Sequence, residues 1–275
     1  MTYFLPKTDI EIINPNIKRG QIRHALFDFD GTISLIREGW QDVMIQMMVA
    51  ILLQTPNHES REEITSIVKE YISRLTGRQT IYQMIQFCEE IKKRGGVPSD
   101  PVIYKHQYHG LLLTNIQHRL DDLRSGNLTP DNMMVPNARH ILREIRAREI
   151  QCYLASGTDE VFVVDEANLL GVASFFNGIF GAKDDYKNTS KRIVIQNIFE
   201  ENNLQGVELI SFGDGYVEIE DTKKVGGIAV GVATNEETRS GVNEWKRLRL
   251  IEAGADIIIP DFSQYQTLIN YLFPE

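Results

Sequence analysis

Five short segments rich in β-branched and aromatic residues recur along the chain, and segments with helical periodicity separate the later ones. Strands that alternate with helices favour a parallel β-sheet covered on both faces. Each segment ends in, or runs into, Asp, Ser, Gly or Thr, and ligands bind at that end of the strands in such sheets. The predicted strands are HALFDFD (24–30), QCYLAS (151–156), VELISFGD (207–214), GGIAVGVAT (226–234) and ADIIIPD (255–261).

Between residues 36 and 132 the pattern changes to helices alone. Four segments there carry apolar residues at helical spacing, glycines separate them, and no convincing strand appears. The stretch is long enough to bury a small core of its own. We therefore expect an α/β core, formed by residues 1–35 and 133–275, with an all-helical insertion at residues 36–132.

Composition and charge argue against several classes of function, although a local basic patch stays open. The chain has 275 residues, of which 42% are hydrophobic and 24% charged, as is usual for a globular protein. The net charge of −9 argues against a nucleic-acid-binding surface. The longest apolar run, near residues 43–53, contains Gln46 and is too short to cross a bilayer.

The first twenty residues are broken by charges and prolines, unlike a signal peptide. The two cysteines, Cys88 and Cys152, show no metal-ligand spacing and favour a reducing compartment. We therefore expect a cytoplasmic protein that has neither nucleic acid nor a membrane as a partner.

The segment LFDFDGTIS places Asp28 and Asp30 two positions apart at the end of an apolar run. In a strand both carboxylates project from the same face and repel each other, so a structural role needs something to offset that repulsion. The other strand ends offer Ser156 and Asp214, and Lys191 lies just before a helix. Together these residues predict a site for a phosphate group and a metal ion.

Each of these residue types has a chemical role in such a site. A carboxylate can attack phosphorus and form an aspartyl-phosphate, which divides hydrolysis into two easier steps. Carboxylate oxygens bind Mg²⁺, which neutralises phosphate charge, and a second aspartate with a raised pKa can protonate the leaving group. A hydroxyl and backbone N–H groups bind phosphoryl oxygens, and a lysine stabilises the transferring group.

Four motifs, DFDGT, LASGTD, a lysine before a helix and GDGYVEIED, resemble in order those of the haloacid dehalogenase-like superfamily. The resemblance covers residues 24–34 and about 133–272. It implies a Rossmann-like parallel sheet with a helical cap inserted after the first motif. Asp30 implies hydrolysis of phosphomonoesters or, less often, phosphosugar transfer. Such a cap closes over the site and favours small soluble phosphates over protein substrates.

The resemblance also implies residue roles. Asp28 is the nucleophile and a Mg²⁺ ligand, and Asp30 is the general acid/base whose backbone carbonyl also binds the metal. Ser156 and Gly157 bind the phosphoryl group of the substrate.

For the later motifs, the resemblance makes Asp214 a metal ligand, directly or through water. Glu218 falls where the family usually has a second aspartate, so its metal role is indirect. Lys191 is the third-motif lysine because SKRIVI opens a helix, and Lys187 is the alternative because the spacing varies.

Several of these residues also have plainer interpretations. A lone pair of aspartates is often a solvated turn, and Ser156 would cap a helix that begins at Gly-Thr-Asp-Glu. Glu218 fits an acidic residue in the first turn of a helix, and Lys191 fits a surface lysine. Arg78 lies between two predicted helices of the insertion, where it either meets an anionic group of the substrate or is an ordinary surface arginine.

We expect a Mg²⁺-dependent phosphatase that acts on a small phosphorylated metabolite. A phosphomutase resembling β-phosphoglucomutase would keep the same residues and suppress the attack of water. A phospho-accepting signalling domain would lack the helical insertion, and a catalytically inactive relative would have lost a motif residue, whereas none is lost here. The substrate, the oligomeric state and the role of residues 1–20, as an edge strand or as outer packing, stay open.

Overall fold

The computed structural model describes residues 2–185 and 190–274. The chain divides into two compact units. The core unit is Met1–Glu38 with Asp122–Glu275, and the helical unit is Gly39–Asp121. Residues 36–38 and 122–132, which the sequence assigns to the insertion, group with the core unit.

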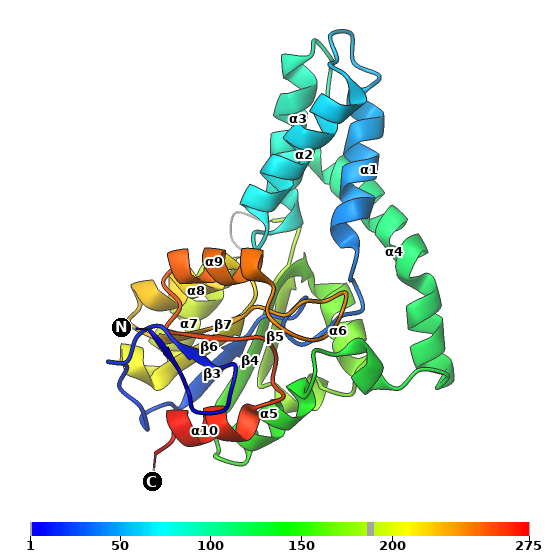
Figure 1. Cartoon of the computed structure of the whole chain (residues 1–275). Helices are drawn as coiled ribbons and strands as arrows, with labels where there is room; N and C mark the ends of the chain where they lie inside the picture. Colours follow the sequence, from blue (N-terminus) through cyan, green and yellow to red (C-terminus); the bar gives the residue numbers. More distant parts are fainter. Residues whose placement is uncertain (1, 186–189, 275) are drawn as a thin grey trace. The chain divides into compact units, whose positions relative to one another are not determined.

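In the described part of the core unit, eight strands form one sheet in the order β1-β2-β8-β7-β6-β3-β4-β5 (Figure 1). Strands β3 to β8 are parallel, whereas β1 and β2 run antiparallel to their neighbours. The predicted α/β fold with a parallel sheet is therefore confirmed. The strands are β1 Tyr3–Phe4, β2 Glu11–Ile12, β3 His24–Phe27, β4 Gln151–Asp159, β5 Gly178–Ala182, β6 Leu209–Gly213, β7 Ile228–Val232 and β8 Ile257–Ile259.

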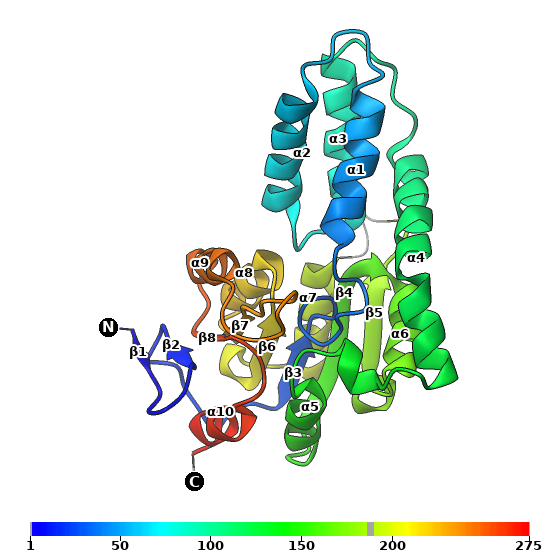
Figure 2. The same cartoon turned by 45° about the vertical axis from the view of Figure 1, so that its right-hand side comes forward.

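Helices cover both faces of this sheet (Figures 1 and 2). Helices α5, α6 and α10 lie on one face of the sheet, and α7, α8 and α9 lie on the other. The chain adds β4 and β5 on one side of β3 and then β6, β7 and β8 on its other side. Because crossovers between parallel strands are right-handed, the two directions place their helices on opposite faces. The core helices are α5 Ala138–Arg146, α6 Glu160–Leu169, α7 Lys191–Asn202, α8 Tyr216–Lys224, α9 Glu244–Glu252 and α10 Tyr265–Leu272, with short 3₁₀ turns at Pro130–Met133, Ala173–Phe175 and Gly206–Glu208.

The helical unit, all of which the structure describes, contains no strand. Its four helices correspond to the four segments with helical periodicity. Helices α1, α2 and α3 pack against one another (Figure 2). They bury apolar side chains such as Met48 and Tyr71. The helices are α1 Trp40–Leu52, α2 Arg61–Leu75, α3 Thr80–Lys93 and α4 Pro101–Ser125, whose last residues belong to the core unit.

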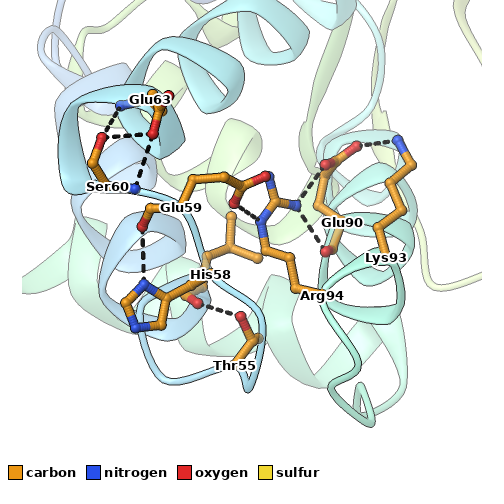
Figure 3. A network of polar contacts seen from close by, with 9 residues as sticks. Thr55, His58, Glu59, Ser60, Glu63, Glu90, Lys93 and Arg94 are labelled. Carbon is orange, nitrogen blue, oxygen red and sulfur yellow. Dashed lines mark hydrogen bonds and ion pairs between the residues drawn. The ribbon is translucent and has the colours of Figure 1, made fainter.

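A buried arginine ties two of these helices together. Arg94 directly follows α3 and is 4% exposed. Its Nε lies 2.6 Å from Oε2 of Glu59, just before α2, and its Nη1 lies 2.8 Å from Oε2 of Glu90 on α3. Figure 3 shows the guanidinium between these two carboxylates. The network therefore joins the start of α2 to the end of α3.

The two ends of the insertion lie side by side in the core unit. Ser34 and Met134 form an antiparallel bridge. The Leu35 N–H donates to the Met133 carbonyl at 2.8 Å, and the Val135 N–H donates to the carbonyl of Ile33 at 3.0 Å. The two stretches that flank the predicted insertion are therefore hydrogen-bonded to each other within the core unit.

Three details correct or complete the expectations from sequence. The strand at Gly178–Ala182 was not predicted. Strand β4 continues past Ser156, with a register shift, and α6 begins only after Asp159. The interpretation of Ser156 as a helix cap is therefore wrong. Residues 1–20 supply the edge strands β1 and β2, so of the two roles left open they take that of an edge.

Among the described residues, no helix combines the length and the apolar character that a membrane crossing requires. Cys88 and Cys152 are both free and buried. The cytoplasmic location itself stays a prediction.

Candidate active site

The candidate site lies where β3, β4 and β6 end at one edge of the sheet. Phe27 of β3 is in register with Leu154 of β4 and with Phe212 of β6. The parallel pairing therefore brings the residues that follow these three positions to the same level. Asp28 comes directly after β3, and Asp214 directly after β6.

Asp28 is held by a buried lysine. The Lys191 Nζ, in the first turn of α7, donates to Asp28 Oδ1 at 2.7 Å and to Glu218 Oε2 at 3.0 Å. Asp28, Lys191 and Glu218 are 7%, 8% and 1% exposed. The sequence therefore placed Lys191 correctly at the start of a helix, and the structure brings it to the carboxylates of two other motifs.

Burial dominates the electrostatics of this group. It raises the pKa of Asp28 well above its ordinary value; Lys191 opposes the rise, whereas Glu218 and Asp214 add to it. Burial also raises the pKa of Glu218, again against the effect of Lys191. Burial alone would lower the pKa of Lys191, but the two carboxylates outweigh it and raise that pKa. Burial and the neighbouring carboxylates therefore disfavour the ionised form of Asp28, and a divalent cation would favour it.

Both oxygens of Glu218 already accept hydrogen bonds. Oε2 accepts from Lys191, and Oε1 accepts from the backbone N–H of Gly215 at 2.7 Å. A Cβ on Gly213 would lie 2.2 Å from Glu218 Oε1, so glycine at this position makes room for the carboxylate. Both interpretations of Glu218 from the sequence therefore hold: it is an acidic residue in the first turn of α8, and it belongs to the site.

Asp30 lies in the turn after β3 and meets hydroxyl groups at the end of β4. The Ser156 Oγ donates to Asp30 Oδ2 at 3.2 Å, and the Thr158 Oγ1 donates to the same oxygen at 2.9 Å. The backbone N–H of Thr158 in turn donates to Ser156 Oγ at 3.0 Å. The sequence pattern did not single out Thr158, although it stands two positions after Ser156 in the LASGTD motif.

A buried ion pair lies next to Asp30. Arg37 bonds Glu166 of α6 through Nη2 to Oε1 at 2.6 Å and through Nε to Oε1 at 3.0 Å. The Nε also lies 3.9 Å from Asp30 Oδ1. Nothing in the sequence singled out Arg37 or Glu166, because 129 positions separate them.

The turn that carries Asp30 depends on Gly31. Its φ of +77° lies in the left-handed region that favours glycine. A Cβ at Gly31 would also lie 2.3 Å from Asp214 Oδ2. The glycine of DFDGT therefore permits both the turn and the close approach of Asp214.

Three carboxylates form a group with the chemistry of a magnesium site. Ligand oxygens of Asp28, Asp214 and Glu218 all lie within 4.8 Å of one another. Such hard oxygen donors suit Mg²⁺. Lys191 bonds one oxygen of Asp28, and Lys246 bonds one oxygen of Asp214 at 2.6 Å. Each of these two carboxylates thus has a second oxygen for a cation, and the donor set fits Mg²⁺.

The remaining candidates stay predictions. Gly157 lies in the irregular end of β4, beside Ser156. Arg78 lies between α2 and α3, with its guanidinium 5.8 Å from the ring centre of Tyr82. Lys187 lies outside the described residues.

Comparison with known proteins identifies the class that this fold and site define. Residues 22–226 match the haloacid dehalogenase-like hydrolase family. The match spans more than half of the chain, from before the first motif to beyond the fourth. The chain belongs to the haloacid dehalogenase-like hydrolases, an enzyme family. Among curated proteins, no sequence matches the chain significantly.

Solved structures share the fold at low sequence identity. A predicted phosphoglycolate phosphatase from Haemophilus somnus has a TM-score of 0.61 at 15% identity, over 90% of this chain and 98% of its own. β-Phosphoglucomutase from Clostridium difficile has a TM-score of 0.57 at 15% identity, over 84% of this chain and 98% of its own. CbbY from Rhodobacter sphaeroides, solved with phosphate, has a TM-score of 0.57 at 16% identity, over 88% of this chain and 96% of its own.

Proposed function

We propose that the protein is a Mg²⁺-dependent phosphatase that hydrolyses small phosphomonoesters through a phosphoryl group carried on Asp28. The observation that carries the proposal is the environment of Asp28. It is a buried carboxylate at a strand end, bonded by Lys191 and close to Asp214 and Glu218. A second aspartate, Asp30, lies two positions away and accepts hydrogen bonds from two hydroxyls.

In the first step, a carboxylate oxygen of Asp28 attacks phosphorus, and the bond between phosphorus and the ester oxygen breaks. Asp30 gives its proton to that oxygen, so the product leaves as an alcohol. Lys191 holds Asp28 in place, and we assign Ser156 and Gly157 to the phosphoryl oxygens. Mg²⁺, when bound by Asp28 and Asp214, supplies positive charge that lets an anionic carboxylate approach an anionic phosphate.

In the second step, Asp30 takes a proton from a water molecule as its oxygen attacks the phosphoryl group on Asp28. The bond between phosphorus and the Asp28 oxygen breaks, inorganic phosphate leaves, and both carboxyl groups return to their first states. Asp30 therefore acts as an acid and then as a base, which its hydroxyl partners and the nearby Arg37 support by fixing its orientation.

We further infer that the helical unit serves as a cap that excludes water and selects the substrate, with Arg78 as a candidate contact. The expected partner is a small phosphorylated metabolite rather than a macromolecule.

A phosphomutase is the second candidate, because β-phosphoglucomutases share the fold. It would use the same residues and return the phosphoryl group to a sugar phosphate instead of water.

The test is phosphate release from a panel of sugar, nucleotide and glycolytic phosphates, with Mg²⁺ and with a chelator. We expect release by the wild type that requires Mg²⁺ and that falls more than about a thousandfold in Asp28→Asn, because the nucleophile is lost. The matched control is Asp9→Asn, the same chemical change at an exposed aspartate, and it should keep wild-type activity.

Each outcome separates the candidates. Release that persists in Asp28→Asn would contradict the mechanism. Phosphorylation of Asp28 without release, with turnover only after a sugar bisphosphate is added, would support the mutase.

A further inference from the structure

Lys246 has no role in the motifs, yet it reaches the candidate metal site. It lies in the first turn of α9 and is 9% exposed. Its Nζ lies 2.6 Å from Asp214 Oδ2 and 2.5 Å from Oε1 of Glu236.

Glu236, in the loop after β7, completes the arrangement. A Cβ at Gly31 would lie 2.3 Å from Asp214 Oδ2 and 3.2 Å from Glu236 Oε1, so both carboxylates pack against the backbone of the DFDGT turn. The same oxygen of Asp214, Oδ2, thus lies next to both the turn that carries Asp30 and the ammonium group of Lys246.

Two lysines therefore each bridge a pair of carboxylates at this site. Lys191 joins Asp28 to Glu218, and Lys246 joins Asp214 to Glu236. The charges of Lys246 and Glu236 sum to zero, so this pair fixes Asp214 without removing the negative charge that attracts a cation. A lysine without Glu236 would neutralise Asp214 and weaken its attraction for a cation.

We propose that Lys246 and Glu236 are positioning residues that set the divalent-cation affinity of the site. Lys246 holds Oδ2 of Asp214, which presents the other carboxylate oxygen to the cation, and Glu236 compensates the charge of Lys246. The inference rests on the proposed function, because it concerns the same metal site. Residues that hold a metal ligand in place commonly account for a 10- to 100-fold difference in metal affinity.

The decisive experiment is titration of the metal-free protein with MgCl₂ in an isothermal calorimeter. The double variant Lys246→Met with Glu236→Gln replaces a neutral ion pair with neutral side chains, so the net charge of the site does not change. We expect its Kd for Mg²⁺ to rise about tenfold or more, because Asp214 is no longer held. An unchanged Kd in a folded double variant would overturn the inference.

The single variant Glu236→Gln keeps Lys246 and the shape of the side chain but removes the compensating charge. We expect its Kd for Mg²⁺ to rise, and this variant decides the question if the double variant fails to fold. A Kd within twofold of the wild type would then contradict the role of the pair.

The matched control is Lys223→Met. Lys223 bonds the buried Asp256 at 2.7 Å, before β8 and therefore at the opposite edge of the sheet. We expect a lower thermal midpoint and an unchanged Kd for Mg²⁺. An equal rise in Kd would mean that general destabilisation weakens binding, which also overturns the inference. A wild type that binds no Mg²⁺ would instead contradict the metal dependence of the proposed function.

Discussion

The two aspartates of DFDGT meet different partners, and this offsets their repulsion. Asp28 bonds the ammonium group of Lys191, whereas Asp30 accepts hydrogen bonds from two hydroxyl groups at the end of β4. Because β3 ends at Phe27, Asp30 lies in the following turn rather than in the strand. The two carboxylates therefore do not occupy one face of a continuous strand.

Glu166 should make stability depend on pH. Burial raises the pKa of Glu166 to about 7, Arg37 opposes the rise, and Asp30 and Asp165 add to it. Between its ordinary value of 4.5 and about 7, the folded protein keeps a proton that the unfolded chain has lost. The unfolding free energy therefore falls as pH rises through this range, by about 3 kcal/mol at most. In Glu166→Gln this part of the decrease should be absent.

The measurement is urea unfolding at pH values from 5 to 8, compared between the wild type and Glu166→Gln. Asp28, Glu218 and Glu236 also have raised pKa values, so only the difference between the two proteins reports on Glu166. Glu144→Gln, at a more exposed pair with Arg148, should keep the wild-type slope. Equal slopes in the wild type and Glu166→Gln would contradict the prediction.

At the residue scale, the sequence predicted the motif positions but not their partners. Asp28 and Asp214 follow apolar runs that mark buried strands, so their positions at the carboxyl ends of these strands were predictable. Lys246 was not, because in NEWKRLRL it has the pattern of an exposed helix face and its partner Asp214 lies 32 positions earlier. Glu236 lies in a polar loop whose path the sequence does not define.

Among the elements, the helices were predictable because their apolar residues follow the helical period. Strand β5 was not, because GIFGA contains two glycines and is mostly half-buried, so it lacks the apolar run that marks the other strands. The end of β4 was also unexpected. A register shift between Ala155 and Asp159 extends the strand past Ser156 and delays the start of α6.

The helical unit should depend on the buried arginine that joins α2 and α3. Replacing Arg94 with Met leaves Glu90 buried without this partner, which we expect to cost about 3 kcal/mol. The loss should be local, so amides of α2 and α3 should exchange hydrogen faster while those of β3 and β6 keep their protection. Hydrogen–deuterium exchange with mass spectrometry measures both.

Lys92→Met provides the control on the same helix. Lys92 pairs with Glu89, and both side chains are more than half exposed. We expect a change of less than about 0.5 kcal/mol and an unaltered exchange pattern. Equal exchange in Arg94→Met and the wild type would show that the network contributes little to the stability of the unit.

In the molecule as a whole, the N-terminal segment completes one edge of the sheet. Glu11 and Ile12 of β2 pair with Ile258 and Ile257 of β8, and Arg247 bonds Glu11 at 2.7 Å. Without β2, β8 would be an edge strand of isoleucines, which invites pairing with other chains. The sequence indicated a parallel sheet through its alternating elements, but two-residue strands such as β2 are too short to show a pattern.

Truncating the buried apolar side chain of β2 should therefore weaken the whole fold. Ile12 is fully buried, so Ile12→Ala should lower the unfolding free energy by about 3 kcal/mol. Phe4→Ala, on the exposed strand β1, should change it by less than about 0.5 kcal/mol. Urea unfolding measures both, and light scattering tests whether the weakened edge self-associates. Similar unfolding free energies of the two variants would mean that the burial of Ile12 in β2 contributes little to the stability of the fold.

The bridge between Ser34 and Met134 has a consequence for how such proteins diversify. Because Ser34 and Met134 are bridged to each other, the sheet tolerates differences in length of the helical unit, Gly39–Asp121, at a small cost in loop-closure entropy. We therefore expect that a change in this unit leaves Asp28, Ser156 and Asp214 in their register on the sheet. If the helical unit selects the substrate, as proposed above, the substrate range could change with this stretch of chain alone.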